Sequence, residues 1–369
     1  SLSITPDARA GGMGDVGAAT NPDLNSQHWN PAKYAFMESK GGITASYTPW
    51  LSKIVKDINL AYIAGYYKWD DVQGISASFR YFSLGTVQLT DYNGSTYQDV
   101  NPNEWAIDVA YSRKLHEFVS MAVALRFMYA DMNPGRGNTG TTPELYPGMT
   151  AAADVAVYYR QPFALPMGDS HLAVGLNISN LGGTISYDQG YTRNYIPANI
   201  RLGVSYELPF DNYNRLSFNF DVNKMMVPTR KSRFAVDENG NYLTGQKLTD
   251  WYSNLRLKGL FYSFCDAPGY IDENGKEVSP FMEELQEITF GLGLEYSYNR
   301  QFFARFGYQH EDAHKGNRRY VTFGAGFHLS IFSLDAGYVL AVSQQNPLDN
   351  TFRVTLGFDL AGIKDLVSK

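Results

Sequence analysis

Strict alternation of apolar and polar residues is the feature that most constrains the fold of this chain. The stretch NIRLGVSYEL places Ile200, Leu202, Val204, Tyr206 and Leu208 on one face and Arg201, Gly203, Ser205 and Glu207 on the other. TFRVTLGFDL, RLSFNFDVN and ITFGLGLEYSY repeat the pattern. Successive side chains of a β-strand point to opposite faces, so each stretch predicts a strand. About fourteen such segments occur, beginning near Gly42, Ile58, Gly74, Glu104, Val119, Gly148, His171, Asn199, Arg215, Ile288, Gln301, Tyr320, Phe332 and Thr351.

Composition narrows the kinds of all-β protein that fit. Aromatic residues make up 15% of the chain and charged residues only 18%, which is below the roughly 25% of an ordinary soluble domain. The sequence contains no apolar run near the length of about 18 residues that a membrane helix needs. A soluble all-β protein or an outer-membrane β-barrel therefore remains, because barrel strands alternate and average out as polar. The net charge of −6 and the lack of a basic stripe argue against nucleic-acid binding.

The connections between the predicted strands separate by length. KWDDVQ, KLHE, PFDNYN, YNR and SIFS are short, whereas LTDYNGSTYQDVNPN, SYDQGYTRNYIPA and a segment of about 60 residues from Val227 to Glu287 are long. The short and long connections largely alternate along the chain. Outer-membrane barrels have this arrangement, with short periplasmic turns and long extracellular loops, and an even number of strands. We therefore predict a fourteen-stranded transmembrane antiparallel β-barrel over residues 41–369, with periplasmic termini.

The polar face of the predicted strands carries many charges. A charge facing lipid costs about 2–4 kcal/mol at mid-depth for Arg or Lys, so these residues are expected to face the lumen. There, opposite charges can pair across strands, and they are predicted to form a charged network, together with residues 1–40, that closes the pore. Its expected members are Arg80, Arg126, Arg201, Arg305 and Arg353, with Asp108, Asp154, Glu207, Asp221, Glu295 and Asp335.

Residues 1–40 do not alternate. DARAGGMGDVGAAT is rich in small residues, and the stretch that follows contains two Asn-Pro turn signals. Small side chains allow close backbone packing in a crowded lumen. We predict that this segment is a hatch that fills the barrel, with a disordered periplasmic tail as the alternative. The residues expected to hold it are Trp29, Asn30, Pro31, Tyr34 and Phe36.

These motifs resemble a known family. ARAGGMGDVGAA followed by NPAKYAF is similar to the N-terminal hatch of FadL-like outer-membrane transporters, which are fourteen-stranded barrels with an internal plug. The longer stretch ITPDARAGGMGDVGAATNPDLNSQHWNPAKYAF, with the following SYTPWL, resembles the PorV (LptO) family of the Bacteroidota type IX secretion system. The resemblance implies an outer-membrane shuttle that collects cargo, by its C-terminal signal domain, from the translocon barrel (SprA/Sov). It also implies delivery to a surface complex of PorU with PorQ and PorZ.

Two other functions fit parts of the sequence. The fold class also suits a FadL-type transporter of hydrophobic molecules, but the predicted lumen is charged and polar. The LptO name reflects a proposed role in lipopolysaccharide O-deacylation, and Asp169, Ser170 and His171 would be the best candidates for a hydrolytic site. No Gly-x-Ser-x-Gly elbow accompanies them, and a polar strand start explains them equally well. We therefore expect a protein that is not an enzyme.

Metal and cofactor sites have little support. DENGN (Asp237–Asn241) and DENGK (Asp272–Lys276) resemble fragments of calcium loops, but each lacks the rest of the twelve-residue ligand pattern. Both are expected to be hairpin turns in which Gly240 and Gly275 adopt positive φ. No metal and no cofactor is predicted.

The long loops are the candidate partner-binding surface, because partners and lipopolysaccharide would meet an outer-membrane carrier there. The Val227–Glu287 loop is too long for a simple connection, and it carries apolar residues near helical spacing. SPFMEELQE is expected to begin a helix, with Ser279 as the N-cap and Pro280 in the first turn. A lid that only covers its own barrel is the alternative. The candidate contact residues are Asn133, Arg136, Tyr146, Trp251, Tyr252, Leu255, Phe261 and Phe264.

Overall fold

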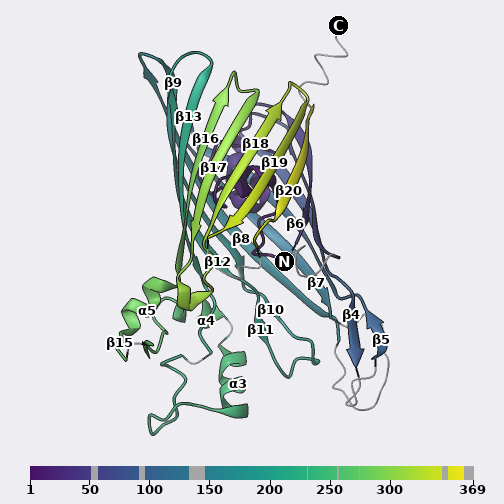
Figure 1. Cartoon of the computed structure of the whole chain (residues 1–369), viewed down its shortest axis with the longest axis vertical. Helices are drawn as coiled ribbons and strands as arrows, with labels where there is room; N and C mark the ends of the chain where they lie inside the picture. Colours follow the sequence, from purple (N-terminus) through teal and green to yellow (C-terminus); the bar gives the residue numbers. More distant parts are fainter. Residues whose placement is uncertain are drawn as a thin grey trace.

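The structure is a closed antiparallel barrel of fourteen strands (Figure 1). The computed structural model describes residues 1–50, 57–90, 96–132, 146–230, 232–255, 257–273, 275–342 and 348–360. The barrel strands are β1 (Gly41–Pro49), β2 (Ile58–Lys68), β3 (Gln73–Leu84), β6 (Asn103–His116), β7 (Val119–Asp131), β8 (Gly148–Leu165), β9 (Gly168–Leu181), β12 (Asn199–Pro209), β13 (Asn214–Met225), β16 (Ile288–Tyr298), β17 (Phe302–His310), β18 (Tyr320–His328), β19 (Phe332–Ala341) and β20 (Phe352–Asp359). The predicted fold class and strand number are confirmed.

The barrel closes between its first and last strands. β1 pairs with β2 on one side and with β20 on the other, so that Gly42 lies opposite Asp359. All the other barrel neighbours are consecutive barrel strands and antiparallel. Closure removes the unpaired edge that an open sheet would present to lipid.

Alternation along the strands separates an outer apolar face from an inner polar face, as predicted. On β12, Leu202 and Val204 are exposed on the outside, whereas Ser205 and Glu207 are buried inside. Aromatic rings contact one another across strands on the outer face. Trp69 and Tyr111, for example, stack with ring centroids 6.2 Å apart at one end of the barrel. An apolar outer band with aromatic residues near its ends is the surface that a lipid bilayer requires.

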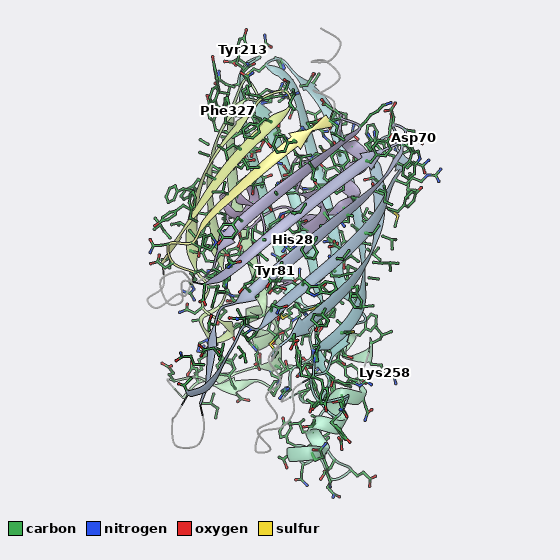
Figure 2. All side chains as sticks on the ribbon, turned by 90° about the vertical axis from the view of Figure 1, so that its right-hand side faces the viewer. His28, Asp70, Tyr81, Tyr213, Lys258 and Phe327 are labelled. Carbon is green, nitrogen blue, oxygen red and sulfur yellow. The ribbon has the colours of Figure 1, made fainter. Side chains whose placement is uncertain are left out.

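The connections separate by length between the two ends of the barrel. Figure 2 places Asp70, Tyr213 and Phe327, from or beside short connections, at one end and Lys258, from the largest loop, at the other. We call these the short-turn end and the long-loop end. The small elements of the long loops are β4 (Val87–Thr90), β5 (Thr96–Val100), β10 (Thr184–Ile185), β11 (Asn194–Tyr195) and η2 (Ala313–Lys315).

The loop between β13 and β16 has its own secondary structure. It contains α3 (Gly245–Asn254), α4 (Leu257–Tyr262), β14 (Tyr270–Ile271), β15 (Glu277–Val278) and α5 (Pro280–Gln286). Ser279 caps α5 as predicted, because its hydroxyl accepts a hydrogen bond from Met282 N at 3.3 Å. The two calcium-like fragments are turns, and Gly240 and Gly275 have φ of 80° and 77°. In the described part of the chain, no helix is long and apolar enough to cross a membrane.

The N-terminal segment lies inside the barrel, where Figure 1 shows it as the dark purple chain. It contains α1 (Ala8–Gly11), α2 (Ser26–Trp29) and the short 3-10 helix η1 (Pro31–Phe36). Most of its residues are buried, and α1 packs against β18, β19 and β20, whereas η1 packs against β3, β6, β7 and β8. The segment therefore spans the lumen from one side of the wall to the other.

Candidate functional site: the lumen and the long loops

Glycines on the barrel wall let the N-terminal backbone lie directly against the strands. A Cβ on Gly307 would come 2.0 Å from Gly14 N, and one on Gly175 would come 1.9 Å from Ala18 O. Gly293 similarly faces Met13 O, at 2.6 Å from a Cβ placed on it. Any side chain at these wall positions would displace the segment. The inward-facing glycines therefore leave space on the wall against which the small-residue stretch of the N-terminus packs.

The Trp-Asn-Pro motif holds the segment together in the centre of the lumen. Trp29 is 1% exposed, and its indole N–H donates a hydrogen bond to Asp7 Oδ2 at 2.6 Å. Asn30 caps η1 by accepting from Ala32 N at 3.1 Å, and its amide donates to Ala18 O and to Val157 O on β8. Pro31 follows in the first turn of η1, where its missing N–H costs nothing.

Tyr34 and Phe36 fix the end of η1 to the wall. Tyr34 is 1% exposed, donates its hydroxyl to Leu24 O at 2.9 Å and stacks on Tyr66 of β2. Phe36 is half-buried and contacts the ring of Tyr158 edge-on. All five residues proposed to hold the segment thus take part in its packing or hydrogen bonding.

One group of lumen charges ties the N-terminal segment to the strands β16, β17 and β19. Glu295 accepts from Arg9 Nη2 at 2.8 Å and from Arg305 Nε at 2.6 Å. Arg305 also contacts Asp335 Oδ1 at 2.6 Å, and Arg9 reaches Asp23 at 2.7 Å. These side chains are largely buried, so each charge depends on its partners for stabilisation. Arg9, which did not appear among the sequence candidates, is the residue that joins the segment to this group.

A second group lies across β6, β7 and β8. Arg126 Nη2 is 2.9 Å from Asp154 and 3.2 Å from Asp108. The amide of Gln27, in the N-terminal segment, donates to Asp108 Oδ2 at 2.9 Å. The same segment therefore contacts both groups, which lie on different parts of the wall.

Three other predicted network members, Asp221, Arg80 and Arg201, contact the N-terminal segment. Asp221 accepts from the backbone N–H groups of Gly17 and Ala18, and Arg80 donates to Ser1 O and Leu2 O. The guanidinium of Arg201 lies 4.3 Å from the centre of the Trp29 ring.

Arg353 and Glu207 are the remaining members of the predicted network. Arg353 Nη1 is 3.5 Å from Gly11 O and 3.7 Å from Asp15, and Glu207 accepts from Asn21 and from Arg215. The predicted charges thus fall into separate groups on the wall, and the N-terminal segment contacts each of them; that they close the pore stays a prediction. Buried backbone groups of a segment with little regular structure need partners, and the wall charges supply many of them.

Among the described residues, two cavities lie in the lumen, one toward each end of the barrel. The long-loop cavity, of about 360 Å³, is lined partly by Arg201, Glu287 and Lys315. The short-turn cavity, of about 640 Å³, is lined partly by Arg160, Arg215 and Arg300. No residue lines both cavities, and residues of the N-terminal segment line each of them. The segment therefore lies between the two cavities.

The candidate hydrolytic residues do not form a catalytic arrangement. Ser170 donates its hydroxyl to Glu207 O, and His171 Nδ1 lies 4.0 Å from Glu207 Oε1. Within the described chain, no hydrogen bond joins the side chains of Asp169, Ser170 and His171. The described residues also contain no group of three or more His, Cys, Asp or Glu side chains that could hold a metal ion.

The candidate contact residues of the long loops differ in exposure. Phe261 is 71% exposed and Phe264 43%, whereas Trp251 and Tyr146 are half-buried. Tyr252 and Leu255 are buried, so they belong to the packing of the loop itself and not to its outer surface. Helical spacing placed these residues on one face but did not say which face packs inside the loop. Asn133 and Arg136 lie outside the described residues.

Ion pairs fasten the largest loop to the barrel mouth. Lys224 of β13 contacts Glu284 at 2.9 Å and Glu287 at 2.7 Å, and Lys315 contacts Glu283 at 2.7 Å and Glu287 at 3.0 Å. Burial lowers the pKa of Lys315, but its hydrogen bonds to these carboxylates outweigh that effect and raise the pKa above the ordinary value.

The same loop contains a carboxyl, that of Asp266, whose charged form is disfavoured in the folded protein. Burial raises the pKa of Asp266 to about 6, against the hydrogen bond that it accepts from Thr229 N at 2.8 Å. The neighbouring charges of Glu284 and Glu287 contribute to this raised pKa.

The comparisons with known proteins identify the family. The family described as "Type IX secretion system protein PorV" matches residues 1–232, which is well over half of the chain. This chain belongs to the PorV family. The matched part covers the N-terminal segment and the barrel strands up to β13, and it ends inside the largest loop. PorV proteins are components of the type IX secretion system, and the family and the barrel together indicate the outer membrane.

Solved structures support the barrel architecture of this PorV-family chain. The toluene transporter TbuX of Ralstonia pickettii is similar with a TM-score of 0.52 at 12% identity, covering 97% of this chain and 98% of that one. The toluene transporter TodX of Pseudomonas putida gives 0.50 at 9% identity, covering 95% of each chain. A Pseudomonas aeruginosa FadL homologue gives 0.47 at 12% identity, covering 96% and 98%. At these identities, the similarity to TbuX and TodX concerns the fold alone. A comparison with curated protein sequences finds no match.

Proposed function

We propose that this protein is a non-enzymatic shuttle of the type IX secretion system. In this role it collects cargo that carries a C-terminal signal domain from the translocon barrel and delivers it to the attachment complex at the cell surface. The observation that carries the proposal is the PorV family match over residues 1–232. The partners in this proposal are the translocon (SprA/Sov), the cargo signal domain, and PorU with PorQ and PorZ.

The filled lumen supports a role in which partners bind outside the barrel. Trp29, Tyr34 and the wall glycines keep the N-terminal segment packed in the lumen, so we propose that residues 1–40 are a hatch that closes the pore. A folded cargo domain is far larger than either remaining cavity. In our account, the barrel is an anchor and the loops make the contacts.

The long-loop end is the proposed contact surface. In the proposed orientation, the termini and short turns face the periplasm and the long loops face the exterior. Phe261 and Phe281 expose 71% and 72% of their surface on α4 and α5 of the largest loop. Exposed aromatic side chains of this kind are favoured anchors at protein interfaces.

Uptake of a hydrophobic molecule is the second candidate, because transporters of toluene share the fold. Polar and charged side chains such as Arg201, Asn177 and Gln309 line much of the long-loop cavity, and this lining does not favour an apolar ligand. A role in lipopolysaccharide O-deacylation has weaker support, because the Asp169–His171 stretch lacks a nucleophile joined to a base.

Recovery of partners from outer membranes tests the shuttle. The tagged full chain is compared with a variant in which Tyr242–Ser279 is replaced by a short Gly-Ser linker, and folding of both barrels is checked by heat-modifiable migration. We expect the full chain to recover the translocon and the cargo, and the shortened chain to recover less of them. Equal recovery by both chains would make the loop only a lid. Recovery of bound lipid without any protein partner would favour the transporter.

A further inference from the structure

The charged side chains that line the short-turn cavity are distributed unevenly around the barrel wall. Most acids of the lining are engaged by an arginine: Glu207 by Arg215 at 2.8 Å, Glu295 and Asp23 by Arg9 at 2.8 and 2.7 Å, and Asp335 by Arg305 at 2.6 Å. Arg160 and Arg300 line it too, yet within the described residues neither has an ion pair or a hydrogen bond from its side chain. The other acids of the lining are the exposed Glu38, which precedes β1, and Asp359 at the end of β20, several strands away from β8. Two guanidinium groups are thus left without a carboxylate partner.

These arginines share one sector of the wall. Arg160 is half-buried on β8, Arg215 lies near the start of β13, and Arg300 is exposed in the turn between β16 and β17. The strands β8, β9, β12, β13, β16 and β17 are consecutive in the barrel. Arg215 lies opposite Ser297 in the register of β13 and β16, which places a hydroxyl group beside the cations. Three guanidinium groups and a hydroxyl group therefore line this sector of the cavity.

The cavity is also large enough for a small ligand and lies at a mouth of the barrel. Its volume of about 640 Å³ is typical of small-molecule sites. Leu329 and Ser330, from the turn between β18 and β19, contribute to its rim at the short-turn end. The planar guanidinium group of arginine matches carboxylate and phosphate oxygens with paired hydrogen bonds.

We propose that the short-turn cavity binds a ligand through an oxyanion group, a phosphate or a carboxylate. Arg160 and Arg300 supply the unpaired cations, and Arg215 and Ser297 add donors from the same sector. The site is separated from the long-loop cavity by the N-terminal segment, so its ligand enters from the short-turn end. Neither cargo delivery nor hydrocarbon uptake requires this site.

Calorimetric titration of the purified full chain in a non-ionic detergent at low salt tests the site. The probes are inorganic phosphate, citrate and a soluble short-chain phosphatidic acid. Preference for phosphate or for citrate identifies the oxyanion, and binding of phosphatidic acid without free phosphate identifies a lipid headgroup. We expect Arg160→Gln and Arg300→Gln each to weaken binding of the preferred probe by about tenfold, since each removes a charge-assisted contact.

Arg113→Gln is the matched control. Arg113 is an exposed arginine near the same end of the barrel, on β6, and it does not line the cavity. The control is expected to bind as the unaltered chain does, and heat-modifiable migration verifies that every variant is folded. The proposal is overturned if none of the three probes binds, or if Arg113→Gln weakens binding as much as the two cavity variants do.

Discussion

Gly14 of the N-terminal segment lies against Gly307 of β17 so closely that a Cβ on Gly307 would come 2.0 Å from the Gly14 nitrogen. Gly14 itself has a φ of 71°, a conformation that other residues rarely adopt. The fit thus depends on glycine on both sides of the contact. Several other wall glycines contact the same segment. The position of the segment in the lumen therefore depends on the absence of side chains on the wall as much as on charges.

The first prediction concerns the contact between Gly14 and Gly307. Gly307→Ala places a methyl group where the Gly14 backbone lies, so the segment must shift and the permeability of the barrel to small solutes should rise. Swelling of proteoliposomes in sugar solutions measures the change. Gly65→Ala is the control, because Gly65 faces outward on β2 and does not touch the segment. An equally high permeability in the control would remove the basis for this prediction.

The second prediction concerns the charges around Glu295. Glu295→Gln leaves Arg9 and Arg305 buried without their shared carboxylate, and breaking a buried pair in this way typically costs about 3–5 kcal/mol. We expect a lower temperature of the heat-modifiable transition and looser binding of the N-terminal segment. Glu117→Gln, in the exposed turn between β6 and β7, should leave the transition unchanged. A transition in Glu295→Gln that matches the unaltered chain would show that the group adds little stability.

Much of the barrel could be predicted from the sequence, because the alternation of apolar and polar residues shows which side chains of a strand share a face. In the segment from Asn199 to Leu208, for instance, the alternation alone predicts that the apolar side chains face outward and that Glu207 faces inward. No information about another strand is needed. The loop lengths then distinguish the two ends. These are local signals, and a closed barrel adds only the constraint that each strand pairs with the next.

Contacts between distant parts of the chain could not be predicted in the same way. Arg9 meets Glu295 across 286 positions, and no local pattern marks that pairing. A signal for the wall glycines was present in the inward positions Gly291 and Gly293 of the stretch GLGLEY, but glycine alternation alone does not say what approaches them. The burial of Tyr252 likewise depends on how the loop helices pack, which helical spacing alone did not determine.

The third prediction concerns the pH dependence of the largest loop. The pKa of Asp266 is raised to about 6 in the folded loop, above its ordinary value of 3.8. The protonated form is therefore favoured by folding, so this group's stabilising contribution is present below about pH 4 and is lost as pH rises through about 6. Hydrogen exchange of the α4 region, corrected for intrinsic rates, should become faster over that interval.

Substitution isolates the contribution of this carboxyl. Asp266→Asn should remove the pH dependence and slow exchange at pH 7, whereas Asp250→Asn, at an exposed position of α3, should retain the behaviour of the unaltered chain. An unchanged pH profile in Asp266→Asn would assign the dependence to another group.

The fourth prediction concerns the exposed aromatic residues of the loop. Phe261→Ser with Phe264→Ser removes two exposed rings without opening the core of the loop, so recovery of secretion partners from outer membranes should fall while the barrel stays folded. Glu238→Ser, in an exposed turn of the same loop, should not affect recovery. Undiminished recovery by the double variant would place the contact surface elsewhere.

The central claim is that residues 1–40 close the barrel, and planar-bilayer conductance tests it most directly. The full chain is compared with a chain that begins at residue 41, and heat-modifiable migration confirms that both barrels are folded. The account predicts few or no open channels for the full chain and stable, large conductance for the shortened chain. Equal conductance from the two folded barrels would contradict it.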